Sequence, residues 1–267
     1  MAILTLSRQF GSGGREVGEA VAASLDYEYL DKEKIFLHVK EAGGKVEAGD
    51  EGLDERCPTL WERYDRSFKA FAALFQTVIL DHAARDRVVV MGRGGNLLLK
   101  DVPHAFRIRV VAPLESRIER ISKREKVDRD TAAWLAEKTD RDRESFVFSV
   151  YGKHSDSPED YDAVIDTAER SLDDVVSGLR DALAERDRLF SDDARKMVEM
   201  RAAAARLKAG LYTNPSFFLP TLDVEFDGST IVLTGIVHNP KEHRKVEEVA
   251  KRLVGDYPLR CSLHYRR

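Results

Sequence analysis

The sequence predicts an α/β fold, with a parallel sheet covered by helices and a smaller α/β domain of order β-β-α-β behind it. Over the first two-thirds of the chain, short apolar runs alternate with longer segments of helical periodicity, an order typical of a parallel sheet. A glycine-rich turn joins the first apolar run to the first helical segment. After residue 220 two alternating segments flank a hairpin turn at Asp227-Gly228, which indicates a second, separate unit.

The helices and strands expected in the first two-thirds of the chain follow from the spacing of its apolar residues. Strands are expected where short apolar runs end at polar or glycine residues, at Ala2–Leu6, Asp26–Asp31, Arg87–Met91, Ala105–Ala112 and Tyr161–Asp166. Helices are expected where apolar residues recur every three or four positions, at Arg15–Leu25, Lys32–Ala42, Leu60–Arg85, Leu114–Lys126, Asp130–Phe146 and Leu172–Leu189. The glycine-rich, acidic stretch 43–58 has weak periodicity, and it is therefore expected to be a loop or insertion.

The last third of the chain has a different composition. An Ala-, Arg- and Lys-rich helix is expected at Asp192–Lys208, and Leu211–Pro220, with two prolines, is expected to be a linker. The final elements are expected to be strands at 222–226, 230–237 and 258–265, with an amphipathic helix at 242–254 between the last two. We therefore predict a domain of residues 1–190, a helical linker of 191–220 and a small domain of 221–267.

The composition argues against a nucleic-acid-binding protein, a cysteine- or histidine-based metal site and a membrane-spanning protein. The 267 residues carry a formal net charge of -4, which gives no general basic field for nucleic acid. The two cysteines, Cys57 and Cys261, and the seven histidines lack metal-type spacing, so no metal-ligating set is predicted. The sequence shows no leader and no apolar run long enough to cross a bilayer, and we expect a cytoplasmic protein.

The glycine-rich turn at residues 7–16 reads Ser-Arg-Gln-Phe-Gly-Ser-Gly-Gly-Arg-Glu. Glycines between a strand and a helix let backbone N–H groups surround an anion, and the helix N-terminus adds partial positive charge. The standard G-x-x-x-x-G-K-[ST] loop has a lysine and a hydroxyl that this chain replaces with Gly14 or Arg15, and Glu16. We predict anion binding here, with a plain tight connection as the alternative.

Further candidate residues follow other predicted strands. Asp31 ends one apolar segment, Arg93 follows another, and an arginine-rich stretch extends from Arg117 to Arg143. The carboxyl ends of parallel strands share one edge of a sheet, so these side chains are expected to meet the glycine loop. Each also has a structural interpretation: Asp31 as a helix N-cap, Arg93 as a partner for a helix end, and the arginines as a solvated face.

The order of these segments resembles a known family. It is carried by the loop Ser-Arg-Gln-Phe-Gly-Ser-Gly-Gly-Arg at 7–15 and by the segments Val88–Arg93, Val110–Arg117, Asp140–Arg143 and Asp160–Thr167. Over about residues 1–185 the chain resembles the cytidylate kinase-like family of the P-loop nucleoside monophosphate kinases. The resemblance implies a P-loop kinase-type three-layer sandwich that uses ATP and Mg²⁺. It also implies phosphoryl transfer to a nucleoside monophosphate, such as CMP, or to another small acceptor.

The resemblance also implies roles for individual positions. Donor phosphates would be held by the loop residues Gly11, Ser12, Gly13, Gly14, Arg15 and Glu16. The acceptor would be bound by Asp31, Arg93, Arg117, Asp140 and Arg141, and catalysis would involve Arg15, Asp31, Arg120 and Arg143. The cation that lysine normally supplies would come from Arg15 or from the nearby Arg8.

The C-terminal segment resembles a BON-like module, through the pattern of Val224–His238 and Ala250–Tyr257. This implies contact with a protein or a ligand, or a homodimer, and a purely stabilising role is the alternative. The missing lysine also leaves a second function open, in which the chain senses a nucleotide without transferring phosphate and signals through this module.

Overall fold

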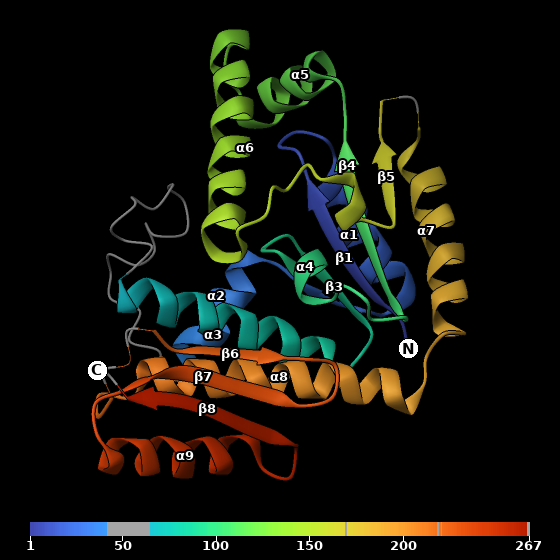
Figure 1. Cartoon of the computed structure of the whole chain (residues 1–267). Helices are drawn as coiled ribbons and strands as arrows, with labels where there is room; N and C mark the ends of the chain where they lie inside the picture. Colours follow the sequence, from blue (N-terminus) through green and yellow to red (C-terminus); the bar gives the residue numbers. More distant parts are fainter. Residues whose placement is uncertain (42–64, 169, 218, 220, 266–267) are drawn as a thin grey trace. The chain divides into compact units, whose positions relative to one another are not determined.

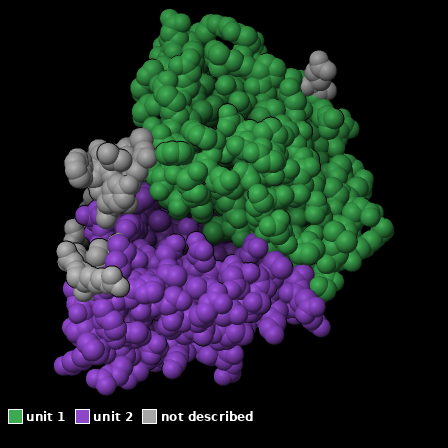
Figure 2. Space-filling model, in the orientation of Figure 1, with its two compact units in different colours: residues 1–34, 47–58, 85–191 green, residues 35–46, 59–84, 192–267 purple. Residues whose placement is uncertain are grey.

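The computed structural model describes residues 1–41, 65–168, 170–217, 219 and 221–265 (Figure 1). Residue contacts divide the chain into two compact units, coloured separately in Figure 2. Unit 1 comprises residues 1–34, 47–58 and 85–191, and unit 2 comprises residues 35–46, 59–84 and 192–267. The predicted loop at 43–58 and the predicted helix start at Leu60 lie outside the described residues.

Unit 1 is built on a five-stranded sheet in the order β2-β3-β1-β4-β5. The strands are β1 (Ile3–Arg8), β2 (Glu28–Leu30), β3 (Val88–Met91), β4 (Ala105–Val111) and β5 (Ala163–Asp166). Every neighbouring pair is parallel, which confirms the predicted parallel sheet. Because β1 lies between β3 and β4, the loops that follow these three strands emerge at the same edge of the sheet.

Helices cover both faces of this sheet. The helices α1 (Gly14–Leu25) and α7 (Leu172–Asp187) bury Val17, Val21 and Leu179 against Leu4 and Val89 on one face. Alternate strand residues point to the other face, where the short helix α4 (Gly95–Leu98) packs on β1. A Cβ at Gly95 would lie 2.9 Å from Cγ1 of Val90, so a glycine is required for this close packing. The result is a three-layer α/β sandwich, as predicted.

Two helices after β4 form a separate packed pair (Figure 1). The helices α5 (Leu114–Glu125) and α6 (Arg129–Tyr151) bury Ile121 of α5 against Ala132 and Ala136 of α6. Asp128 caps α6 by accepting a hydrogen bond from the Thr131 N–H at 2.9 Å. The helix continues beyond its predicted end at Phe146, since Gly152, in the left-handed region, is the first residue suited to end it.

Unit 2 combines helices with a three-stranded sheet. Its elements are α3 (Arg66–Ala83), α8 (Asp192–Thr213), β6 (Asp223–Phe226), β7 (Ile231–Val237), α9 (Pro240–Val254) and β8 (Leu259–Tyr265). The strands β6 and β7 are antiparallel, whereas β7 and β8 are parallel and are joined by α9. The small C-terminal α/β unit of order β-β-α-β is therefore present as predicted.

The contact grouping differs from the predicted domain boundaries at α3 and α8. The helix α8 is part of the unit 2 core, because Ala203 and Leu207 are buried there together with Ala73 of α3. A run of alanines at 202–205 gives α8 a small surface on which α3 can lie closely, so the predicted linker begins as a core helix. The helix α2 (Lys32–Glu41) crosses the division between the units after Lys34. Within the described residues, no helix has the length and apolar content needed to span a membrane.

Candidate functional site

The glycine loop connects the end of β1, at Arg8, to the start of α1, at Gly14. Gly11 and Gly13 have positive φ angles of 78° and 81°, a conformation that glycine adopts without strain. Gly13 is the N-cap residue of α1, and no side-chain hydrogen bond caps this helix end in the described structure. The first N–H groups of α1 are therefore available to an anion, and the helix dipole favours one there.

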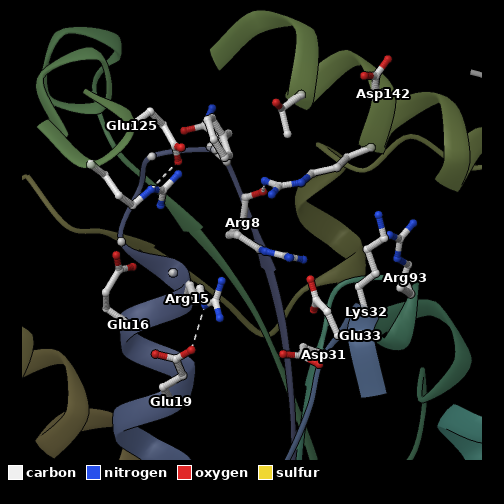
Figure 3. Close-up of a pocket in the computed structure, with 18 of the residues that line it drawn as sticks. Arg8, Arg15, Glu16, Glu19, Asp31, Lys32, Glu33, Arg93, Glu125 and Asp142 are labelled. Carbon is white, nitrogen blue, oxygen red and sulfur yellow. Dashed lines mark hydrogen bonds and ion pairs between the residues drawn. The ribbon is translucent and has the colours of Figure 1, made fainter. Parts of the chain in front are cut away.

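A cavity of about 820 Å³ opens beside this loop (Figure 3). Its walls come from the loop, the end of β2, the first turn of α2, the end of α5 and the middle of α6. Charged side chains of both signs line it, namely Arg8, Arg15, Lys32, Arg93, Arg124, Lys138 and Arg143, with Glu16, Glu19, Asp31, Glu33, Glu125 and Asp142. This lining suits a highly charged ligand and not an apolar one.

Three arginines of this cavity, Arg8, Arg93 and Arg143, repel one another, and we call them the cavity arginines. Burial, reinforced by the charge of Arg93, lowers the pKa of Arg8 to about 10. Burial, reinforced by the charge of Arg8, lowers the pKa of Arg143 to about 9, although Asp140 acts in the opposite direction. The Arg8 guanidinium makes no hydrogen bond or ion pair with any described residue. An anion bound between these groups would remove the unfavourable interaction.

Arg15 lies at the edge of the cavity and points away from the loop. Its side chain is 64% exposed, and its Nε donates to Glu19 at 2.8 Å (Figure 3). The hydrogen bond that Arg15 donates to Glu19 raises the pKa of Arg15 above its ordinary value, the opposite of the shift at Arg8. Glu16 lies in the first turn of α1 and also lines the cavity.

Arg117 and Asp140 hold the loop from outside the first cavity. Asp140 accepts the Phe10 N–H at 2.7 Å and an Nη1–H of Arg117 at 2.6 Å. Arg117 is buried and also donates to the Phe10 carbonyl at 3.2 Å. The structure therefore places these two predicted acceptor residues against the loop backbone, where they position it.

Arg120 and Ser12 belong to a second support. Arg120 donates to the hydroxyl and the carbonyl oxygen of Thr167, each at 3.0 Å. The Thr167 hydroxyl donates to the Ser12 carbonyl at 2.6 Å, and the Ser12 hydroxyl donates to the Gln9 carbonyl at 2.9 Å. Neither Arg120 nor Ser12 lines the cavity, so both are brought close to the loop but not into the space beside it. We call Arg117 and Arg120 the supporting arginines.

A second cavity of about 550 Å³ adjoins the first, and Arg8, Gln9, Arg93 and Arg143 line both. Asp140 and Arg141 line the second cavity. Arg141 is 65% exposed and lies 3.6 Å from Glu137, which makes it a surface ion pair. The three cavity arginines therefore stand at the junction of two polar spaces.

Asp31 combines two of the roles considered for it. One of its oxygens, Oδ1, accepts the Lys34 N–H at 3.0 Å and so caps α2. The side chain also lines the first cavity near Arg8, where its charge opposes the lowering of the Arg8 pKa. Capping uses one carboxylate oxygen, and the other remains for a ligand or a metal ion.

Some residues near the site were not singled out from the sequence. The Phe10 ring is contacted by two arginines: its centroid lies 4.9 Å from the guanidinium carbon of Arg124 and 5.6 Å from that of Arg143. Tyr151 donates its hydroxyl to the Arg93 carbonyl at 2.8 Å and fixes the loop after β3. In the sequence, only the position of Phe10 inside the glycine loop pointed to it. Nothing in the sequence pointed to Tyr151, since it follows the predicted end of its helix.

Folding also gathers Glu144, His154 and Asp156, which the spacing of the histidines did not predict. Their potential ligand atoms lie within 4.8 Å of one another, at the edge of the second cavity. Glu144 already accepts hydrogen bonds from His154 at 2.7 Å and from the Ser155 N–H at 2.9 Å. These bonds account for the arrangement without a metal ion.

Comparison with known proteins gives a family match. The model of the cytidylate kinase-like family matches residues 3–169, which is more than half of the chain and includes the loop and both cavities. Among solved structures, an uncharacterized protein from Eubacterium ventriosum ATCC 27560 is 19% identical, with a TM-score of 0.55, over 69% of this chain and 99% of that one. This likeness extends to the fold alone.

Other matches are weaker or shorter. Shikimate kinase from Bacteroides thetaiotaomicron is 13% identical over 68% of this chain and 98% of that one, with a TM-score of 0.40. A uronate isomerase from Corynebacterium glutamicum is 34% identical over 98 residues, which are 37% of this chain and 19% of that protein. The chain therefore spans less than a fifth of the length of this curated relative.

Proposed function

The chain belongs to the cytidylate kinase-like family, and from this we propose that it is an ATP-dependent phosphotransferase acting on a small anionic acceptor such as a nucleoside monophosphate. Family membership supports a kinase-type phosphotransferase. The observation that carries the proposal is the group of cavity arginines at the junction of the two cavities, directly beside the glycine loop. Phosphoryl transfer brings two anionic groups together, and positive charge is needed at the point where they meet.

The first cavity suits the triphosphate of ATP. The N-terminus of α1 offers uncapped N–H groups, and Arg8, Arg124 and Arg143 supply positive charge around the same space. Asp31 and Glu33 are carboxylates near Arg8, and their oxygens are of the type that Mg²⁺ accepts. These residues would hold the cation, which when bound neutralises phosphate charge.

The second cavity suits the acceptor. Arg93 and Arg143 would bind its phosphate from the side that the two cavities share, and Arg109 of β4 lines the remaining wall. The chain's own residues then act chiefly by orienting both phosphates and by stabilising charge that develops between them. No side chain has to form a covalent bond to the substrate in this scheme.

A substrate screen tests the proposal. Purified full-length protein would be incubated with ATP, Mg²⁺ and each common nucleoside monophosphate, with product formation and nucleotide binding measured in parallel. Gly13→Val should abolish turnover, because valine is strained at the φ of 81° that closes the loop. Gly228→Val is the matched control, since Gly228 also has a positive φ, of 99°, but lies in a turn of unit 2. Unchanged activity in Gly13→Val would contradict the proposal.

A second candidate function is a nucleotide sensor without transfer. It is favoured by the absence of a lysine from residues 7–16 and by the Ser12 hydroxyl, which is already bonded to the Gln9 carbonyl. Tight nucleotide binding without turnover of any monophosphate would support the sensor. Neither binding nor turnover would exclude both functions.

The role of unit 2 is a separate part of the proposal. Contact with a protein or ligand, homodimerisation and a relation to BON modules remain predictions from the sequence. Deleting residues 215–267 would disrupt the unit 2 core, because the Tyr212 hydroxyl donates to the Leu222 carbonyl and α8 packs on β6. The solution mass of the intact chain is therefore the appropriate first measurement.

A further inference from the structure

The standard phosphate loop can be aligned with this chain in two registers. If Gly14 is the second glycine of G-x-x-x-x-G-K-[ST], Arg15 takes the lysine position. If Gly13 is that glycine, Gly14 takes the lysine position and Arg8 takes the position of the first glycine. The second register agrees with the backbone, because Gly13 ends the loop in the left-handed conformation and α1 begins at Gly14.

In this register the two positions have exchanged residue types, and the packing explains why. A Cβ placed on Gly14 would lie 2.7 Å from Cβ and 3.2 Å from Cγ of Arg8. The stem of Arg8 therefore occupies the space into which a lysine stem at position 14 would extend. Gly14 is the residue that makes room for Arg8.

The far end of Arg8 is accommodated by a second glycine. A Cβ on Gly92, in the loop after β3, would overlap Nη1 of Arg8. The side chain thus runs from Gly14 to Gly92, and Arg8 lines both cavities. Arg15 reaches neither glycine and is held on the surface by Glu19.

We infer that Arg8 replaces the lysine of the phosphate loop, with its cation supplied from the end of β1 and with Gly14 and Gly92 providing the space. This inference rests on the proposed phosphate-binding function. A guanidinium differs from an ammonium because its planar fork can bind two oxygens at once. Placed at the junction of the cavities, Arg8 is suited to contact donor and acceptor phosphates together.

The test is a reciprocal exchange in the full-length protein, with Mg²⁺-ATP and inorganic tripolyphosphate as binding probes. Arg8→Met should weaken binding of both probes tenfold or more, and Arg8→Lys should weaken it less. Gly14→Lys alone should bind poorly because two stems compete for one space. The double variant Arg8→Gly/Gly14→Lys, which restores the first glycine and the lysine of the standard motif but keeps Arg15 at the hydroxyl position, should bind at least tenfold more tightly than either Arg8→Gly or Gly14→Lys.

Controls separate binding from folding. Arg188→Met removes a 74% exposed arginine of unit 1 that pairs with Glu185, and its affinity should equal that of the wild type. Arg8→Met should not lower the stability of the free protein, because burial disfavours the charge of Arg8. If the double variant does not fold, the difference between Arg8→Met and Arg8→Lys decides the question.

The outcomes distinguish the inference from the function on which it rests. A wild-type chain that binds neither probe would defeat the proposed function. A wild-type chain that binds both, together with an Arg8→Met variant of equal affinity, would overturn only the role of Arg8.

Discussion

The supporting arginines and the cavity arginines surround the same loop but have opposite environments. Arg117 and Arg120 donate to a carboxylate, a hydroxyl and backbone carbonyls, so their charge is matched by acceptors. Arg8 faces Arg93, and its guanidinium has no acceptor among the described residues, whereas Arg143 faces Arg8 but also donates to the Arg8 carbonyl at 3.2 Å and lies 3.9 Å from Asp140. Burial and the neighbouring cations lower the pKa of both. An arginine whose donors are taken by fixed acceptors stabilises the loop, whereas Arg8, held among cations, has binding capacity left for an anion.

The difference originates in position relative to the sheet. The supporting arginines come from α5, on the outer side of the loop, where Asp140 of α6 and Thr167 after β5 supply acceptors. The cavity arginines come from the end of β1, the loop after β3 and the inner side of α6, which meet at the carboxyl edge of the strands. The fold thus brings three arginines together at the place where parallel sheets bind ligands.

The largest effect on stability is expected from a substitution that removes the carboxylate acceptor of a supporting arginine. Asp140→Ala should lower the free energy of unfolding by about 3 kcal/mol, because it leaves buried Arg117 without its carboxylate and the Phe10 N–H without its acceptor. Nucleotide affinity should fall as well, since the loop loses its support. Chemical denaturation and calorimetric binding measure the two effects.

Glu137→Ala provides the matched control for Asp140→Ala. Glu137 is also on α6 and also pairs with an arginine, but both partners are at least 60% exposed. Its loss should change stability by less than about 0.5 kcal/mol. Equal effects of the two substitutions would mean that Asp140 does not support the loop.

The next largest effect should be a loss of tripolyphosphate affinity at high pH, because the cavity arginines lose their charge. Their lowered pKa values, about 9 for Arg143 and about 10 for Arg8, mean that the free protein loses these charges as the pH rises through this range. Phosphate ionises near pH 6, so its charge is constant there. Affinity for tripolyphosphate should be level between about pH 7.5 and 8.5 and should fall about tenfold by pH 10, one pKa unit above Arg143.

The stability of the free protein should respond to pH in the opposite direction. Above pH 9 the unfolded chain retains protons on these arginines that the folded chain has lost, so their contribution to stability rises with pH. Titrations followed by calorimetry and by thermal unfolding, with Arg8→Met for comparison, measure both trends. A fall in affinity that is identical in Arg8→Met would exclude Arg8 as its source.

The sequence predicted the elements better than the roles of the arginines. Continuous apolar runs identified β1 and β3, because their side chains are buried on both faces of the sheet. The sequence did not separate Arg117 and Arg120 from Arg143, since all three lie on polar helices and only the tertiary structure shows that Arg143 alone of the three lines the cavities. The strand was expected to end at Leu6, but pairing with β4 continues to Arg8, whose side chain lies against Gly14 and Gly92.

The smallest expected effect concerns Arg15, which the sequence placed at the lysine position. Its pair with Glu19 is exposed and spans i to i+4 on α1, a geometry that contributes about 0.3 to 0.5 kcal/mol. Arg15→Ala should therefore change stability by no more than this and should weaken tripolyphosphate binding less than threefold, measured beside Arg8→Met. A larger loss in Arg15→Ala than in Arg8→Met would show that Arg15 turns from Glu19 to the phosphate on binding, and the division between supporting and cavity arginines would then have to include a third, mobile member.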